Sequence, residues 1–547
     1  MAIASAMPRL RAAIAQDRSA SALAGLFEPL DHMLVGGGDQ RIQIDRARGA
    51  NAYGCRPFPC PDTLSVASCT ATSISQRAYD RIGRAREQLM QSAIAEGLET
   101  AFDARIEAMR DELKACLGLS QGDAEVVLSP SGTDAQLQAL WLVRALSGPA
   151  LTTVIVAADQ TGSGTVYTAR GQHFSAASAN GIKATKGEPI EGLADGLASL
   201  ALGSLDESGN SCSAAESDAR VIAAIESAIA NETPVLLQIM DCSKLGWRAP
   251  SDRCLDEIAA RWPTAVQVVV DACQMRLGRP RLRSYLQRGY IVIVTGSKFF
   301  TGPAFSGALL VPASLSRTLD AAAVAPAGFA EYSSRSDWPM NWPLLRARFP
   351  LRANFGQWLR WEAALSEMQA YYSVPDEFRR FALQMFAKKV ERIVAASPSL
   401  RLLPGRLNPD DRRGEDEEFA VPTIFPVVLG HHQQMLSLGD CRKIHRALAC
   451  RVRPGGAAKG QRRVQLPTKI CLVGQPVAFG ASEREPLAAL RICASARLVT
   501  DAWSSQPDIA RRNLKRELDA VGTIVSKIEW LVGHQDGQDF AEACDEA

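Results

Sequence analysis

The sequence predicts an α/β protein with a large domain, built on a mainly parallel sheet covered by helices, and a smaller α+β C-terminal domain. Short apolar runs alternate with helical patterns between residues 125 and 294, which is typical of parallel strands buried on both faces. This alternation stops after Pro312. The chain has 547 residues, 47% of them hydrophobic, which is room for about two to four domains.

The elements of the large domain follow a segment, 1–75, that is rich in turns. Its first 26 residues lack the apolar core of a secretory signal and are expected to form a surface helix, with a transit peptide as the alternative. A helical apolar face runs over 76–119. Strands are then expected at 125–128, 152–157, 235–240, 265–270 and 290–294, and helices at 135–146, 217–230 and 252–261.

The C-terminal part has a different order of elements. Helices are expected at 357–372 and 377–396, followed by strands at 423–429, 470–473 and 490–493 and a closing helix at 509–530. We therefore divide the chain into an N-terminal segment (1–75), a large domain (76–365) and a small domain (366–547).

Composition excludes several classes of protein. The formal charge is +2, so there is no bulk electrostatic reason to bind nucleic acid or an anionic membrane. No apolar run approaches the length of a membrane span. The 13 cysteines include no C-x-x-C pair, so we expect neither a metal site nor a disulfide framework, and we expect a reducing, cytoplasmic location.

Three short segments carry candidate chemistry. Ser131-Gly132-Thr133 lies between a strand and a helix, where it would bind a phosphate or simply cap the helix. Asp271 ends a buried strand, where it would face a ligand or cap the next turn. Lys298 sits among small and aromatic residues, where it would be a Schiff-base nucleophile or a lysine whose head reaches water.

Together these segments resemble the fold type I pyridoxal-phosphate enzymes, and within them the class V aminotransferase and cysteine desulfurase group. That group carries D-x-x-Q and then a lysine motif that ends in Gly-Pro, in this order. Here Asp271 and Gln274 precede Lys298 and Gly302-Pro303. The resemblance covers roughly residues 76–500 and implies pyridoxal 5′-phosphate as the cofactor. It also implies a homodimer with shared active sites and an N-terminal segment that covers the active site.

The resemblance also implies roles for individual residues. Lys298 would bind the cofactor as a Schiff base and move the α-proton, and Asp271 would pair with the pyridinium nitrogen. Gln274 would lie near the 3′-oxygen. The phosphate would be held by Ser131, Gly132 and Thr133, with Thr295 or Ser297 adding a hydroxyl. Arg491 would clamp the substrate α-carboxylate, or else pair with an acid at the domain surface.

Further residues fit the family pattern less directly. No aromatic follows the strand at 152–157, so Gln160, Thr161 or His173 would cover the cofactor ring. Asn354 would reach the phosphate of the neighbouring subunit, or the basic run before it would form a charged interface. Asn51 and Arg56 in the N-terminal segment would contact substrate. The loop 451–459 has no cysteine where a desulfurase carries its nucleophile, which disfavours sulfur transfer through a persulfide.

The sequence thus predicts an enzyme that removes the α-proton of an amino acid with a free α-carboxylate. We expect transferase chemistry, either amino transfer or β/γ-replacement, in small-molecule biosynthesis. A carbon–sulfur lyase and a non-catalytic protein that keeps the fold for binding or regulation are the alternatives.

Overall fold

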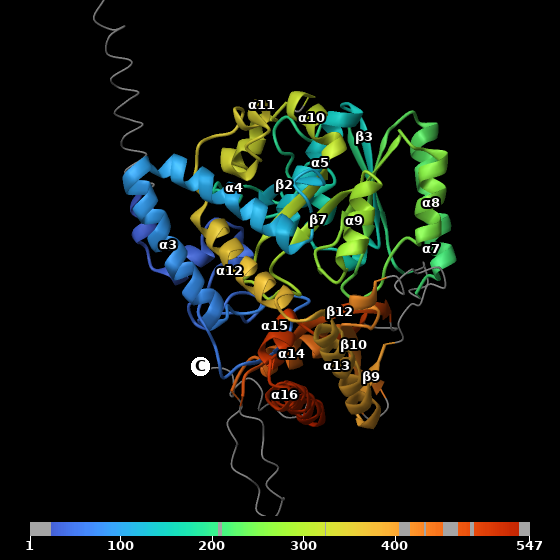
Figure 1. The fold of residues 1–547 in the computed structure, drawn as a ribbon. Helices are drawn as coiled ribbons and strands as arrows, with labels where there is room; N and C mark the ends of the chain where they lie inside the picture. The colour runs from blue at the N-terminus through green and yellow to red at the C-terminus, as the bar shows by residue number, and fades with distance from the viewer. Residues whose placement is uncertain are drawn as a thin grey trace, which may run out of the picture.

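The computed structural model describes residues 23–205, 211–322, 324–403, 416–431, 434–451, 469–481 and 486–534. A large domain with helices on both sides of a sheet lies above a smaller domain (Figure 1). The α/β class expected from the sequence is therefore confirmed. The surface helix expected at the start of the chain falls mostly outside the described residues, as does nearly all of the loop 451–459.

The large sheet has seven strands in the order β2-β8-β7-β6-β5-β3-β4. They are β2 (Ala124–Ser129), β3 (Leu151–Val156), β4 (Leu197–Leu202), β5 (Val235–Met240), β6 (Val266–Asp271), β7 (Ile291–Thr295) and β8 (Gly307–Pro312). All neighbours are parallel except β8, which runs antiparallel to both β7 and β2. The sequence pattern did not predict β4 or β8.

Helices cover this sheet. They include α3 (Gln76–Glu96), α4 (Leu98–Cys116), α5 (Gly132–Ser147), α7 (Ala214–Ala230), α8 (Asp252–Arg261), α9 (Arg279–Gln287), α10 (Ala313–Ala322) and α12 (Phe355–Tyr372). The helical pattern over 76–119 forms two helices because Gly97 lies between them with φ of 87°, a conformation that only glycine adopts at little cost.

The small domain is built on a second sheet. Its strands are β9 (Leu400–Leu402), β10 (Ile424–His431), β11 (Gln434–Met435), β12 (Cys471–Ala481) and β13 (Pro486–Cys493), and its helices include α13 (Asp376–Ala396), α14 (Leu438–Leu448), α15 (Ala496–Ala502) and α16 (Pro507–Gly533). β1 (Leu64–Val66) pairs with β12 in parallel, so part of the N-terminal segment belongs to the small-domain sheet.

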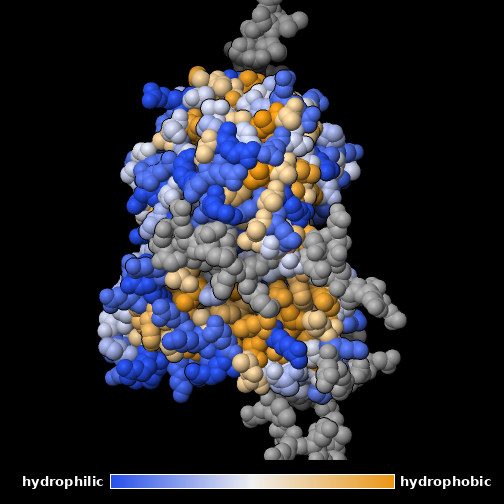
Figure 2. Space-filling model, turned by 90° about the vertical axis from the view of Figure 1, so that its right-hand side faces the viewer, coloured by the Kyte–Doolittle hydropathy of each residue, from blue (hydrophilic) through white to orange (hydrophobic). Residues whose placement is uncertain are grey.

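The surface differs between the two halves. Polar residues dominate the upper half of the face in Figure 2, whereas an apolar area lies on its lower half, which is the level of the small domain. Across the described ranges, no helix has both the length and the hydropathy needed to span a membrane.

Gly307 is a point where two strands and a turn meet. It starts β8 and pairs with Ser129 and Thr295. A Cβ atom there would lie 2.3 Å from the main-chain oxygen of Ser131, which cannot move like a flexible side chain. We therefore expect Gly307→Ala to lower the free energy of unfolding by roughly 1–3 kcal/mol, measured by urea titration. Gly122→Ala is the matched control, because its Cβ would have no atom within 4 Å, and an equal effect of both substitutions would contradict this packing.

Candidate active site

The parallel strands bring the predicted segments to one edge of the large sheet. β2, β5, β6 and β7 point the same way, so the residues that follow them meet at their carboxyl ends. Two close contacts confirm the proximity of these loops. A Cβ at Gly132 would lie 2.7 Å from Cys273 Sγ, and Thr295 Oγ1 donates to the Cys273 carbonyl oxygen at 2.7 Å.

Asp271 is a buried carboxylate held from two sides. The main-chain N–H of Cys273 donates to Oδ1 at 3.1 Å, and Gln136 Nε2 donates to Oδ2 at 3.2 Å. Gln136 is itself oriented by Thr165, whose hydroxyl donates to Gln136 Oε1 at 2.9 Å. These bonds offset the cost of burying the carboxylate and leave lone pairs free for a ligand.

Lys298 follows β7 and is half-buried. Its neighbours Phe299 and Phe300 are fully buried and pack edge-to-face on Tyr371, which anchors the main chain at this point. Among the residues that the structure describes, Lys298 Nζ has no hydrogen-bond or ion-pair partner within reach. Both Lys298 and Asp271 lie within electrostatic range of the Cys273 thiol, and they come from the adjacent parallel strands β7 and β6.

The turn before α5 combines a helix cap with a cation. Ser131 Oγ accepts from the main-chain N–H groups of Thr133 and Asp134, as an N-cap does. Arg41 also reaches this turn, with Nη2 at 3.4 Å from Ser131 Oγ and 3.5 Å from Thr133 Oγ1. Arg41 is held by Asp39, which it contacts at 2.5 Å. The helix start, two hydroxyls and a guanidinium together suit an anion.

The two hydroxyl candidates of the lysine loop differ. Thr295 already gives its hydroxyl hydrogen to the Cys273 carbonyl oxygen. Ser297 is buried, and no acceptor for its hydroxyl lies within the described residues. Ser297 is thus the one whose hydrogen is available to a ligand.

The stretch 68–72 of the N-terminal segment crosses the site. Cys69 O accepts from Gln274 Nε2 at 3.1 Å, and Thr70 Oγ1 accepts from Arg491 Nη2 at 3.0 Å. Thr72 Oγ1 donates to the Thr301 carbonyl oxygen at 3.1 Å. This stretch links the loops of the large domain to β13. The amide oxygen of Gln274, Oε1, is buried with no partner in the described structure.

Arg491 projects from β13 and is buried. Besides Thr70, its guanidinium donates to the carbonyl oxygens of Gln475 at 3.0 Å and Lys244 at 3.4 Å. These acceptors are neutral and use three of the five N–H groups. Two N–H groups therefore remain for a carboxylate.

Sequence reasoning missed a thiol pair beside Arg491. Cys69 and Cys493 pack together with Ile424. Burial raises the pKa of the Cys69 thiol, but the bond to Cys493 and the charges of Arg491 and Arg276 outweigh it and bring that pKa below its usual range. Burial and the same pairing raise the pKa of Cys493. The signal for this pair was lost because its members are 424 positions apart, counted as 493 − 69.

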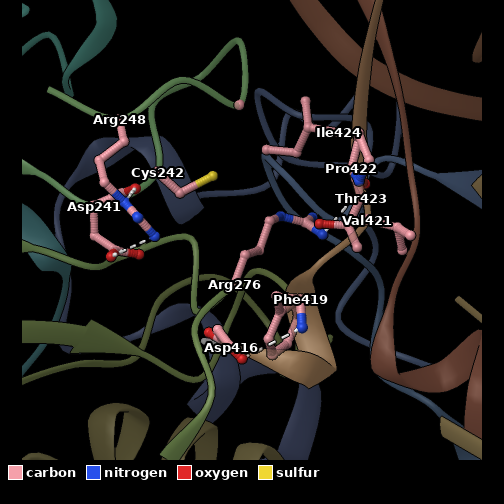
Figure 3. Close-up of a pocket in the computed structure, with 11 residues that line it drawn as sticks. Asp241, Cys242, Arg248, Arg276, Asp416, Phe419, Val421, Pro422, Thr423 and Ile424 are labelled. Carbon is pink, nitrogen blue, oxygen red and sulfur yellow. Dashed lines mark hydrogen bonds and ion pairs between the residues drawn. The ribbon is translucent and has the colours of Figure 1, made fainter. Parts of the chain in front are cut away.

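A small pocket, partly open to solvent, adjoins the thiol pair at the junction of the two domains (Figure 3). Arg276 points across it toward Thr423, and Asp416 and Phe419 lie below. Cys242 lines the pocket and also packs against the thiol pair. Lys298 does not line this pocket, so the pocket is distinct from the site around the lysine.

Other predicted residues are engaged elsewhere. Asn51 Oδ1 accepts from the main-chain N–H groups of Tyr53 and Cys55 and so closes a turn. The Arg56 guanidinium lies 5.9 Å from the Phe58 ring. Asn354 caps α12 and donates to the Gly37 carbonyl oxygen at 3.1 Å. None of these bonds reaches Arg491 or Lys298.

Of the three candidates for covering a cofactor ring, Gln160 and Thr161 lie beside the turn before α5. Gln160 and Thr161 precede a glycine loop in which a Cβ at Gly164 would lie 2.5 Å from a side-chain carbon of Thr133. Gln160 Oε1 is buried and has no partner in the described ranges. His173 instead bonds to the Tyr332 hydroxyl at 2.6 Å.

No protein-family model and no curated protein sequence matches the chain. Three similar solved structures are a NifS-like protein from Rickettsia africae, the cysteine desulfurase CsdA from Escherichia coli and a putative histidinol-phosphate aminotransferase from Erwinia carotovora atroseptica. Their identities are 10%, 14% and 12%, with TM-scores of 0.46, 0.45 and 0.40. The alignments cover 85%, 86% and 83% of this chain and 99%, 95% and 96% of the other chains. At these values the likeness assigns no activity or site residue to this chain.

Within the described residues, no group of three or more His, Cys, Asp or Glu side chains is placed to hold a metal ion.

The turn before α5 contains a buried carboxyl group, Asp134, whose titration makes the stability of the protein depend on pH. Burial and the nearby charge of Asp39 raise its pKa from 3.8 to about 7, against the opposing bond from Ser131. The native state therefore holds this proton up to higher pH than the unfolded chain does, and stability falls as pH rises from about 4 to about 7.

We expect Asp134→Asn to remove this fall. Between pH 4 and 7 the variant should gain roughly 2–4 kcal/mol of unfolding free energy relative to wild type, measured by urea titration at several pH values. Asp508→Asn, which removes an exposed carboxylate, is the control for the substitution itself. A flat difference for Asp134→Asn would show that this carboxyl does not titrate in that range.

Proposed function

We propose that this protein is a pyridoxal-phosphate-dependent enzyme that acts on an amino acid, with transferase chemistry as the first candidate. One observation carries the proposal. Lys298 has an amine without a partner in the described structure, and Asp271 has a carboxylate fixed by two hydrogen bonds. Asp271 ends β6 and Lys298 follows the adjacent parallel strand β7, so both lie at one edge of the sheet. This pair suits the aldehyde and the pyridinium nitrogen of that cofactor.

The remaining groups fit the same cofactor. Arg41, Ser131 and Thr133 form an anion site at the start of α5, which suits the phosphate. Gln274 Oε1 is a buried acceptor without a partner in the described structure, which suits the ring hydroxyl. When bound, pyridoxal phosphate supplies an electron sink for a carbanion.

The protein's own residues would divide the remaining work. Lys298 Nζ would take the proton from the substrate α-carbon and return it, because this amine has no partner in the described structure and follows the strand next to that of Asp271. Asp271 would keep a proton on the ring nitrogen by its negative charge. Arg491 would orient the substrate through its two remaining N–H groups, and Gln160 or Thr161 would shield the ring from water.

Two further features stay proposals from the resemblance. We propose a homodimer in which Asn354 acts at the site of the partner subunit, and a cytoplasmic location. Asn354 donates a hydrogen bond to Gly37 of the N-terminal segment. The same segment carries Arg41, which contacts the turn before α5.

The lysine assignment is tested by labelling. Purified protein incubated with pyridoxal phosphate should show a visible absorbance band that borohydride abolishes. Peptide mass spectrometry of the reduced protein should then place the pyridoxyl group on Lys298, because this amine has no competing partner. We expect Lys298→Ala to lose both signals and Lys443→Ala, at an exposed position, to keep them. A pyridoxyl group on another lysine, or no label at all, would refute the proposal.

The role of Arg41 is tested by comparing two ligands. We expect Arg41→Met to weaken the binding of pyridoxal phosphate by about 10- to 100-fold, since a charge-assisted bond to an anion is lost. The binding of pyridoxal, which lacks the phosphate, should change little. Fluorescence titration measures both, with Arg48→Met at an exposed site as control. Equal losses for both ligands would mean that Arg41 acts only on the fold.

A carbon–sulfur lyase is the second candidate, favoured by the thiol pair next to Arg491. Cys69, with its lowered pKa, would meet a sulfur-containing side chain beside the clamped carboxylate. The two candidates differ in their products. A lyase releases an oxo acid and ammonia from a sulfur amino acid alone, whereas an aminotransferase needs an added oxo-acid acceptor and releases no ammonia.

A further inference from the structure

Positive charge at the site is not matched by carboxylates in direct contact. Lys244, Arg276, Lys298 and Arg491 all lie around it. Arg491 contacts only neutral acceptors, and Arg276 donates to the carbonyl oxygen of Ala494 at 3.1 Å and to the Ser68 hydroxyl at 2.9 Å. Within the described parts of the chain, none of the four makes an ion pair. Arg276 and Arg491 are buried, and Lys244 and Lys298 are half-buried. A desolvated cation without a counter-ion is costly, so this arrangement favours an anionic ligand.

Lys244 is the member of this group that the proposed function leaves without a role. It lies in the loop after β5, and Ser243 fixes that loop because its hydroxyl accepts from the N–H groups of Leu245 and Trp247 at 3.2 and 3.0 Å. The Lys244 carbonyl oxygen accepts from Arg491. The main chain of Lys244 is therefore tied to the arginine expected to hold the substrate carboxylate. Its Nζ has no partner in the described structure.

The charges that face Lys244 come from four elements. Burial is the largest cause that lowers its pKa, to about 8, and the charges of Arg491 on β13 and Lys298 after β7 lower it further. Asp159 in η3 (Ala158–Gln160) and Asp271 on β6 oppose them. The Asp159 carboxylate already accepts hydrogen bonds from the N–H of Ser204 at 2.6 Å and from the Ser204 hydroxyl at 2.5 Å. These bonds partly compensate the negative charge of Asp159.

The site of the cofactor phosphate is separate from Lys244. In the described structure Arg41 contacts Asp39 and the hydroxyls of Ser131 and Thr133, whereas the loop of Lys244 contacts Arg491. Lys244 instead shares its surroundings with Arg491. A second anionic group beside the clamped α-carboxylate would thus meet Lys244.

We propose that Lys244 binds a second carboxylate of the substrate, so that the enzyme acts on an acidic amino acid with a carboxylate in its side chain. This inference rests on the proposed function and deepens it. Arg491 holds the α-carboxylate, and Lys244 holds the distal one by a charge-assisted hydrogen bond. Lys244 is thus a specificity-determining residue.

Binding of dicarboxylates without an amine tests this directly, because they cannot react with the cofactor. Cofactor-loaded full-length protein is titrated by calorimetry with malonate, succinate and glutarate and with their monoamides. We expect at least one dicarboxylate to bind about 10- to 100-fold more tightly than its monoamide at pH 7. In Lys244→Met this ratio should fall to about one, whereas Lys443→Met should keep it.

The pH dependence provides a second readout. Above about pH 8 the Lys244 ammonium loses its proton, so dicarboxylate affinity should fall up to tenfold per pH unit while monoamide affinity stays level. Lys244→Arg should abolish this fall, since a guanidinium stays charged. This readout uses wild type, so it decides the matter even if Lys244→Met fails to fold.

The outcomes separate the two proposals. A ratio near one in wild type, or a ratio unchanged in Lys244→Met, overturns the role of Lys244 and leaves the cofactor assignment standing. Failure of the labelling of Lys298 overturns the proposed function, whatever the dicarboxylates do. A dicarboxylate preference lost in Lys244→Met and in wild type above pH 8 supports the inference.

Discussion

The site depends on the shared direction of β2, β5, β6 and β7. Because these strands are parallel, the residues that follow them meet at one edge, although they are far apart in sequence. The same geometry creates a cost, since Asp271 ends a strand that is buried on both faces. Gln136 and the main chain of Cys273 meet that cost, and Thr165 in turn orients Gln136. The carboxylate is thus fixed before any ligand binds, which is the preorganisation that an electrostatic role requires.

The N-terminal segment is the second structural requirement. It adds β1 to the small-domain sheet and then crosses the loops of the large domain at 68–72. Gln274 from one domain and Arg491 from the other donate to adjacent residues of this stretch, Cys69 and Thr70. The relative placement of the lysine loop and Arg491 therefore depends in part on hydrogen bonds to this stretch. A change in this stretch would alter both halves of the site together.

Sequence alone indicated the α/β class and most strands, because buried parallel strands leave continuous apolar runs. It missed β8, whose apolar run follows directly on the lysine loop, and β4, which is an edge strand with a half-exposed pattern. It picked out Asp271 and Lys298 because such residues are unusual at strand ends. It could not find Arg41, Cys69 or Lys244, since their significance comes only from neighbours that the fold supplies. The Asn51 side chain closes a local turn, a structural role that a short motif cannot distinguish from binding, so its predicted contact with substrate stays a prediction.

The distribution of charge relates Arg41 and Lys244, which the sequence did not indicate, to Arg491, which it did. Arg41 is paired with Asp39 and stands at a helix start, so it suits a group with more than one negative charge. Arg491 and Lys244 have no such partner in the described structure, and both are tied to one loop. Burying Arg491 and half-burying Lys244 would be unfavourable in a protein that bound only neutral molecules, because a desolvated cation needs compensation. A cofactor phosphate at one end and an acidic substrate at the other would supply it. The site is then most stable when filled, and ligand binding itself adds to the stability of the fold.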